Sequence, residues 1–153
     1  MYRSAIGRPR VLLVVSHPAV GGGIETLLRL ERRYEVRRAT RLTEALRIAP
    51  SWPADLALVD ALMVPPEGRV ALGVPTLVLA GGEGENEAAA RRLDDPRGWV
   101  AKDAESASLI AAVERLLTPA TEAAAGPLPL AVIGVLVLIL AALLLYLVWT
   151  AVV

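Results

Sequence analysis

The sequence contains no cysteine and only one histidine, His17. Without cysteine the chain can form no disulfide, no thiolate metal site and no cysteine nucleophile, and one histidine excludes a site with several histidine ligands. The sixteen basic and sixteen acidic residues cancel, so no basic field attracts nucleic acid. We therefore expect no nucleic-acid partner and no metal, and we find no pattern that calls for a cofactor or a small-molecule substrate.

Charge is missing from one long stretch, because Leu128–Val153 contains no charged residue. About 20 apolar residues suffice to cross a bilayer core of roughly 30 Å as a helix. Tyr146 and Trp149 stand near the far end, where aromatic side chains anchor helices at the membrane interface. A buried core helix is the alternative, but one of this length normally has a polar stripe. We expect residues 128–153 to form a transmembrane helix.

The distribution of basic residues predicts the orientation of this helix. Every arginine and the single lysine precede it, and the positive-inside rule then places the N-terminal part in the cytoplasm. The apolar run near the N-terminus is too short for a signal peptide. We expect a single-pass, tail-anchored protein of the cytoplasmic (inner) membrane, with the lipid bilayer as its first partner and residues 118–127 as a short linker. Small residues could pack against other transmembrane helices, namely Ala131, Gly134, Ala141 and Ala142.

Residues 10–117, after an extension over residues 1–9, alternate between apolar runs and segments with helical periodicity. Strand-like and almost entirely apolar runs predict a parallel sheet that is covered on both faces. We expect an α/β domain of the flavodoxin-like, doubly wound type, with five strands in the order 2-1-3-4-5. The expected strands are 11–15, 35–39, 56–59, 77–79 and 99–101, and the expected helices are 24–33, a short one from Thr43, 85–93 and 106–117.

The third helix of this pattern is shortened. Between Asp60 and Pro75 the chain has room for a proline turn and about one helical turn. We expect this gap to expose one flank of the sheet.

Polar residues follow several of the expected strands, at the sheet edge where ligands usually bind. They are Ser16 and His17 after the first strand, Asp60 after the third and Lys102 after the fifth. Lys102 is the only lysine among sixteen basic residues, so a chain that otherwise uses arginine has a compact ammonium at this position. We expect Lys102 and Asp60 to face each other.

These residues resemble a response-regulator receiver domain. The resemblance covers most of residues 10–117, and it is most specific over residues 98–103. It implies that Asp60 is at the phosphoryl-acceptor position and that Lys102 is the lysine that contacts phosphate. It also implies an output surface on the fourth helix, fifth strand and last helix, with Trp99, Ile110 and Val113. The matching segments are RVLLVVSHPAV, ADLALVDALMVP, VPTLVLAGGE and RGWVAKDAESASLIAAVERLL.

The sequence departs from the family at two functional positions. Where the family has two adjacent acids that help to hold Mg²⁺, this chain has Val15 and Ser16, and Mg²⁺ needs hard oxygen ligands in octahedral geometry. Where the family has a serine or threonine at the end of the fourth strand, this chain has Ala80. The aromatic switch residue, Trp99, would therefore lack its hydrogen-bonding partner.

These departures favour a degenerate pseudo-receiver. We predict a membrane-anchored protein-interaction module that is not an enzyme, with a membrane protein as its partner, as in an accessory subunit of a membrane complex. Asp60 and Lys102 would then form a structural ion pair, with Asp60 a vestigial phosphoacceptor. The alternative is a genuine phosphorelay receiver that accepts phosphate on Asp60 from a histidine kinase.

Three further features have mainly structural interpretations. We expect His17 to be a hydrogen-bonded turn residue, and residues 21–23, three glycines, to be a flexible helix start. Gly81-Gly82 could border a site for a nucleotide or a corrinoid, although the pattern is weak. A run of arginines around the second strand is expected to be a solvated edge, with contact to anionic lipid as the alternative; it comprises Arg32, Arg33, Arg37, Arg38 and Arg41.

Overall fold

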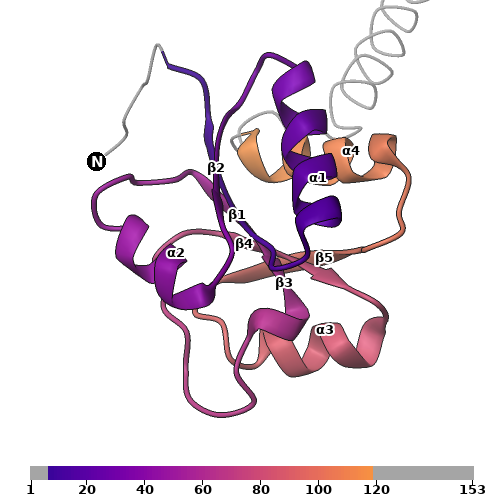
Figure 1. The fold of residues 1–153 in the computed structure, drawn as a ribbon. Coiled ribbons are helices and arrows are strands. Elements are labelled where there is room, and N and C mark those ends of the chain that lie inside the picture. Colours follow the sequence, from indigo (N-terminus) through magenta and orange to yellow (C-terminus); the bar gives the residue numbers. More distant parts are fainter. Residues whose placement is uncertain (1–6, 119–153) are drawn as a thin grey trace, which may run out of the picture. The chain divides into compact units, whose positions relative to one another are not determined.

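The computed structural model describes residues 7–118. Its helices and strands belong to one unit, Met1–Leu117, and Figure 1 shows the strands with helices around them. The strands are β1 (Arg10–Val14), β2 (Glu35–Ala39), β3 (Leu56–Asp60), β4 (Thr76–Ala80) and β5 (Pro96–Ala101). The helices are α1 (Pro18–Leu30), α2 (Leu42–Ile48), the 3₁₀ turn η1 (Ala61–Met63), α3 (Glu83–Ala90) and α4 (Ser106–Leu117).

The five strands form one parallel sheet in the order β2-β1-β3-β4-β5, which confirms the predicted topology. Every residue of β3 and β4 is buried, because these strands have neighbours on both sides and helices over both faces. The carboxyl ends of β1, β3, β4 and β5 lie along one edge of the sheet, which brings the residues that follow them together.

Alternate residues of each strand pack into two separate cores. Leu56 and Leu58 of β3 join a core with Leu28 of α1 and Leu109 of α4. The residues between them point to the opposite face, where smaller side chains such as Ala45 of α2 and Ala89 of α3 lie close to the sheet. The period of two along the strands thus accounts for both layers of helices. Figure 1 shows α1 and α4 on one side of the sheet and α2 and α3 on the other.

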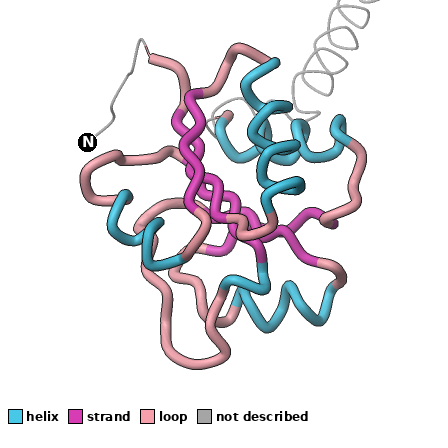
Figure 2. The backbone as a smooth tube through the Cα atoms, viewed as in Figure 1, coloured by secondary structure: helices cyan, strands magenta, loops and turns pink. Residues whose placement is uncertain are grey.

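The shortened third helix is present as the single turn η1, followed by a long loop that Figure 2 shows in pink. The expected exposure of one sheet flank is wrong. Val70 and Leu72 of the loop are 3% and 4% exposed and pack into the core beside α3. The Asp94 carboxylate holds the loop in place by accepting the Leu72 and Gly73 N–H groups at 3.2 and 2.8 Å. Two buried side chains therefore take the place of the missing helix.

Helix α1 begins six residues earlier than its apolar stripe predicted. Pro18 is in the first turn of the helix, where the backbone N–H groups have no partner within the helix, so the missing N–H of proline costs nothing. Residues 21–23 lie inside the helix. The expectation that these glycines form a flexible start is therefore wrong. A Cβ at Gly21 would lie 3.2 Å from Cδ of Arg38 on β2, so the Arg38 side chain would have to move slightly to admit a larger residue.

Within residues 7–118, no helix is long and apolar enough to cross a membrane. The predicted transmembrane segment, 128–153, with Tyr146 and Trp149, and most of the predicted linker lie outside the described residues.

Candidate functional site

Asp60 is the last residue of β3 and is one of only two polar residues that are buried among those described. Its Oδ1 accepts the N–H of Leu62 at 3.0 Å and thereby caps η1. The same oxygen lies 2.8 Å from Nζ of Lys102. The turn after β3 therefore fixes the carboxylate in one orientation, with its charge directed at the neighbouring strand end.

Lys102 directly follows β5, and its backbone N–H donates to the Ala80 carbonyl at 3.0 Å, which continues the β4–β5 ladder. Its Nζ contacts Asp60 and also lies 3.1 Å from Oε1 of Glu85 on α3. The side chain is one-quarter exposed. The structure thus brings together Asp60 and Lys102, as we expected from the strand order, and adds a second carboxylate.

Glu85 was not singled out as a site residue by the sequence analysis. It is the third residue of α3, and its Oε2 accepts the N–H of Gly81, just before the helix. Glutamate at this position commonly reaches back to an unpaired N–H at a helix start. That pattern, Gly81-Gly82 followed by Glu85, is the signal that could have placed Glu85 at the sheet edge.

The charges at this site stabilise one another. The Gly81 N–H, and then the hydrogen bond and charge of Lys102, lower the pKa of Glu85 despite its partial burial. Burial alone would lower the pKa of Lys102, but hydrogen bonds and charges from Asp60 and Glu85 outweigh this and raise it. Glu85 and Lys102 thus both have a greater preference for their charged forms in the fold. The Lys102 ammonium lies between two carboxylates, those of Asp60 and Glu85.

The donor set of this cluster does not fit a divalent cation. Val15, at a position that is acidic in the resembled family, is 1% exposed and packs in the core beside Leu28. Ser16 is exposed and has only a neutral hydroxyl, whereas Mg²⁺ in proteins is held through carboxylates and other hard oxygen ligands. Among residues 7–118, no three histidine, aspartate or glutamate side chains gather as metal ligands.

No family model and no curated protein matches this chain. Solved structures do. A protein from Chloroflexus aurantiacus J-10-fl described as a response regulator is 25% identical, with a TM-score of 0.63 over 72% of this chain and 98% of that one.

Two further matches have the same fold. The receiver domain of a sensor histidine kinase from Pseudomonas aeruginosa PAO1, with a magnesium ion in its active-site cleft, is 22% identical, with a TM-score of 0.62 over 72% of this chain and 98% of its own. A two-component response regulator of the LuxR family from Aurantimonas sp. SI85-9A1 is 23% identical, with a TM-score of 0.61 over 72% and 86%. Residues 10–117 form a receiver-like domain.

Ala80, which the resemblance places where receiver domains have a switch hydroxyl, is fully buried at the end of β4. Trp99 pairs in register with Val78, two residues before Ala80, and is 39% exposed. The two predicted switch-like residues therefore lie on adjacent strands, but Ala80 offers no side-chain hydrogen bond to couple them.

Of the three residues predicted for an interaction surface, one is misplaced. Trp99 is exposed and Ile110 is partly buried, but Val113 is 0% exposed. Val113 lies on the apolar stripe of α4 with Leu109 and Ala112, and this stripe packs on the sheet. A partner on this face would reach Trp99 and the edge of Ile110 but not Val113.

The other candidate residues have local structural roles. The Nδ1 atom of His17 faces the Val20 N–H at 3.5 Å, at the start of α1. Arg33 pairs with Glu114 at 2.8 Å, and Arg37 stacks over the ring of Trp52 at 5.2 Å. These contacts favour the solvated-edge interpretation of the arginine run over a lipid-binding one.

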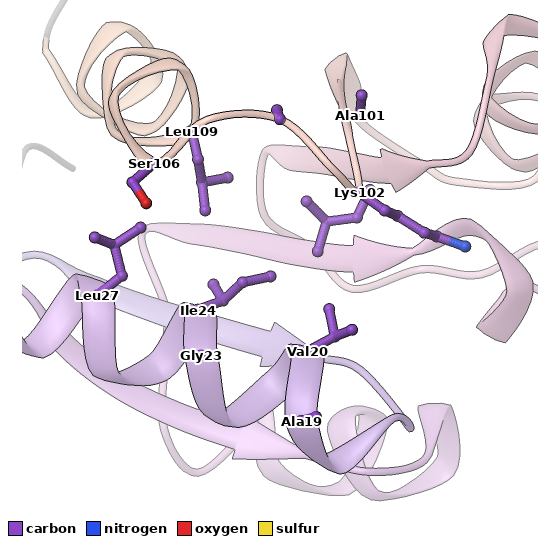
Figure 3. Close-up of a pocket in the computed structure, with 11 residues that line it drawn as sticks. Ala19, Val20, Gly23, Ile24, Leu27, Ala101, Lys102, Ser106 and Leu109 are labelled. Atoms are coloured by element: carbon purple, nitrogen blue, oxygen red, sulfur yellow. The ribbon is translucent and has the colours of Figure 1, made fainter.

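A cavity of about 290 Å³ lies between α1 and the start of α4. Figure 3 shows Val20, Ile24 and Leu27 of α1 on one side of it, and the Lys102 side chain extending away from them. Its lining is mostly apolar and is separate from the Gly81-Gly82 edge proposed for a nucleotide or corrinoid. The N–H of Gly81 already donates to Glu85.

Proposed function

We propose that this receiver-like domain is a protein-interaction module whose state does not depend on phosphorylation, held at the cytoplasmic face of a membrane by residues 128–153. The observation that carries the proposal is the charge cluster at the sheet edge. Lys102 is shared between Asp60 and Glu85, and an aliphatic side chain, Val15, is buried where a second metal-binding carboxylate would be needed.

Electrostatics support this proposal. One ammonium and two carboxylates leave the cluster with a net charge of −1, and a phosphodonor brings further negative charge. Phosphoryl transfer depends on cations, usually a metal ion, to neutralise charge on the phosphoryl oxygens. Each 1.4 kcal/mol of lost stabilisation slows the reaction tenfold, so a site without the metal accepts phosphate far too slowly for signalling.

The proposed partner is a membrane protein or complex, of which this chain is an accessory subunit. The face formed by α3, β5 and α4 displays Trp99, and large aromatic side chains are enriched at the energetic centres of interfaces. Anchoring in the same bilayer raises the effective concentration of the two partners without any additional contact.

The second candidate function is a phosphorelay receiver that accepts phosphate on Asp60. Two observations favour it: Asp60 ends β3, and Lys102 lies 2.8 Å from its carboxylate. The Pseudomonas receiver domain, which binds magnesium in its cleft, has the same fold.

Phosphodonor labelling distinguishes the two candidates. The full-length protein, purified in mild detergent, is incubated with acetyl phosphate and Mg²⁺, and its intact mass is compared with that of Asp60→Asn. We expect neither protein to gain a phosphate. An acid-labile gain of one phosphate that is absent from Asp60→Asn would overturn the module proposal and establish the receiver.

The interaction face is tested by co-purification. Tagged full-length protein is isolated from native membranes in mild detergent, with Trp99→Ala and Leu30→Ala as a matched pair, because Leu30 is 73% exposed on α1, away from the proposed face. Leu30→Ala removes an exposed apolar side chain from α1, an element outside the proposed face. We expect the same co-purifying membrane protein with the unchanged chain and Leu30→Ala, and its loss with Trp99→Ala. Retention by Trp99→Ala would show that the partner binds elsewhere.

A further inference from the structure

The carboxylate of Glu85 is held at two points beside Asp60. One of its oxygens lies 3.1 Å from Nζ of Lys102, and the other accepts the N–H of Gly81. Lys102 follows β5 and Gly81 follows β4, so the two donors come from neighbouring strand ends. Together they bind one carboxylate that originates in a third element, α3.

An ammonium and a backbone N–H that converge on one point form a binding site for an oxyanion. Phosphate and phosphoryl groups need donors of this kind. In this chain the donors are already occupied by a carboxylate of the chain itself, beside the end of β3 that holds the candidate acceptor, Asp60.

The residue at position 81 is compatible with this arrangement. A Cβ at Gly81 would lie 2.9 Å from Oε2 of Glu85, so the flexible end of the Glu85 side chain would have to shift if a larger residue stood there. The φ of Gly81 is not in the left-handed region that favours glycine, so backbone conformation does not require glycine there. The absence of a side chain at Gly81 leaves room for the Glu85 carboxylate.

We propose that Glu85 is an internal anion that closes an oxyanion pocket formed by Lys102 and Gly81. It takes the place of an external phosphate or phosphoryl group and ties α3 to the ends of β4 and β5, so that this side of the domain keeps one arrangement. The inference deepens the proposed function on which it rests, because it supplies the reason why the module would not respond to phosphate.

Two physical effects favour Glu85 over an external anion. The carboxylate is attached to the pocket by a short segment, so it competes with an external anion at a fixed effective concentration that dilution does not lower. It also lies in the first turn of α3, where the partial positive charge of the helix start favours an acidic side chain. An external anion can enter only when Glu85 is removed.

The test compares three variants of the full-length protein in mild detergent: Asp60→Asn, Asp60→Asn with Glu85→Ala, and Asp60→Asn with Glu83→Ala. Asparagine at position 60 removes the charge that would repel phosphate from Lys102. Glu83 is the matched control, because it lies in the same first turn of α3. The Tm of each variant is measured against inorganic phosphate, with sodium chloride at equal ionic strength as the reference.

We expect phosphate to raise the Tm of the Glu85→Ala variant saturably, because a ligand that binds only the folded protein stabilises it. The other two variants should respond to phosphate as they do to chloride. An equal response in all three variants, or none in any, would overturn the inference. If the double variant does not fold, Glu85→Ala and Glu83→Ala in the otherwise unchanged chain give the same comparison with a smaller shift.

The two proposals fail in different ways. If phosphate does not raise the Tm of the Glu85→Ala variant and Asp60 is not labelled in the unchanged chain, only the proposed role of Glu85 is rejected. Labelling of Asp60 by acetyl phosphate in the unchanged chain rejects the phosphorylation-independent module, whatever the Tm values show.

Discussion

A single ammonium connects three elements at the carboxyl edge of the sheet. Asp60 is 6% exposed, and Lys102 is its only cationic partner among the contacts of the described residues. A buried carboxylate without a counter-ion is costly, although an ion pair as a whole contributes little because both charges lose water. Removing Lys102 should therefore destabilise the protein, because it leaves the buried Asp60 carboxylate without a counter-ion.

We expect Lys102→Ala to lower the free energy of unfolding by about 1–3 kcal/mol, below the value for a fully buried pair because the lysine is partly exposed. The double variant Asp60→Asn, Lys102→Ala should be less destabilised, since a neutral amide needs no counter-ion. Urea unfolding at pH 7 measures both. If the double variant loses the sum of the two single losses, the carboxylate does not depend on the lysine.

The pH dependence of stability should identify Glu85. Its pKa is lowered from 4.5 in the fold, so its charged form stabilises the protein above pH 4.5, and this contribution is lost as the pH falls through the lowered value. Lys102 has a raised pKa, so its contribution persists up to pH 10.5 and is lost only above that. Between these limits the two groups add no slope.

We therefore expect Glu85→Gln to be less stable than the unchanged protein at pH 7, and the difference to shrink as the pH falls below 4.5. Glu83→Gln, which changes the residue two positions before Glu85 on α3, should keep the acid dependence of the unchanged protein. Unfolding free energies measured from pH 7 to pH 3 provide the test. A difference that stays constant with pH would show that Glu85 acts through its shape and not its charge.

The site could be predicted in part from the sequence. Asp60 and Lys102 come together because parallel strands end at a common edge, and strand order alone gives this. Glu85 could not be placed in the same way, because its role depends on a side chain that reaches back from a helix to the preceding loop. The burial of Val113 shows a related limit: a helix over residues 106–117 was predicted, but not which of its residues remain at the surface.

At the scale of single elements, α1 is unusual because three consecutive glycines lie within it. Glycine in a helix costs about 1 kcal/mol relative to alanine. Replacing one of these glycines by alanine should therefore stabilise the protein unless neighbouring atoms leave no room for the new methyl group. A Cβ at Gly23 meets nothing within 4 Å, whereas one at Gly21 meets Arg38 and Val15.

We expect Gly23→Ala to raise the free energy of unfolding by about 0.5–1 kcal/mol. Gly21→Ala should gain clearly less, because the side chain of Arg38 must move away from the new methyl group. The urea midpoints of the two variants, measured side by side, test this. Equal stabilisation of both would mean that Arg38 yields at no cost and that packing does not require Gly21.

The elements themselves were predicted with uneven success for physical reasons. The buried strands β1, β3 and β4 are continuous apolar runs and were located from the sequence for that reason. The edge strands β2 and β5 are largely exposed and have weaker patterns, but they were also located. Helix α1 was placed too late, because Gly21, Gly22 and Gly23 mimic a loop. The stretch after η1 was wrongly expected to leave the sheet uncovered. The packing of Val70 and Leu72 could not be foreseen, because it depends on the distant Asp94 and not on any local periodicity.

At the scale of the whole chain, polar and apolar residues are separated along the sequence. Residues 7–118 form a charged domain with its own two cores, whereas Leu128–Val153 has no charge. A helix over that segment would rise by about 39 Å, enough for a bilayer core of about 30 Å. The described domain buries its sheet with its own residues, and we therefore propose a bilayer as the environment of residues 128–153.

We expect the full-length chain to stay with bacterial membranes after alkaline carbonate extraction, and a chain that ends at Leu117 to be released. Leu136→Arg with Leu140→Arg should also be released, because each arginine near the centre of a span costs about 3 kcal/mol. Protease added to the outside of spheroplasts should leave the domain intact, since the positive-inside rule retains it in the cytoplasm. Release of the full-length chain by carbonate would remove the anchor, and partner binding through Trp99 would then have to occur without a shared bilayer.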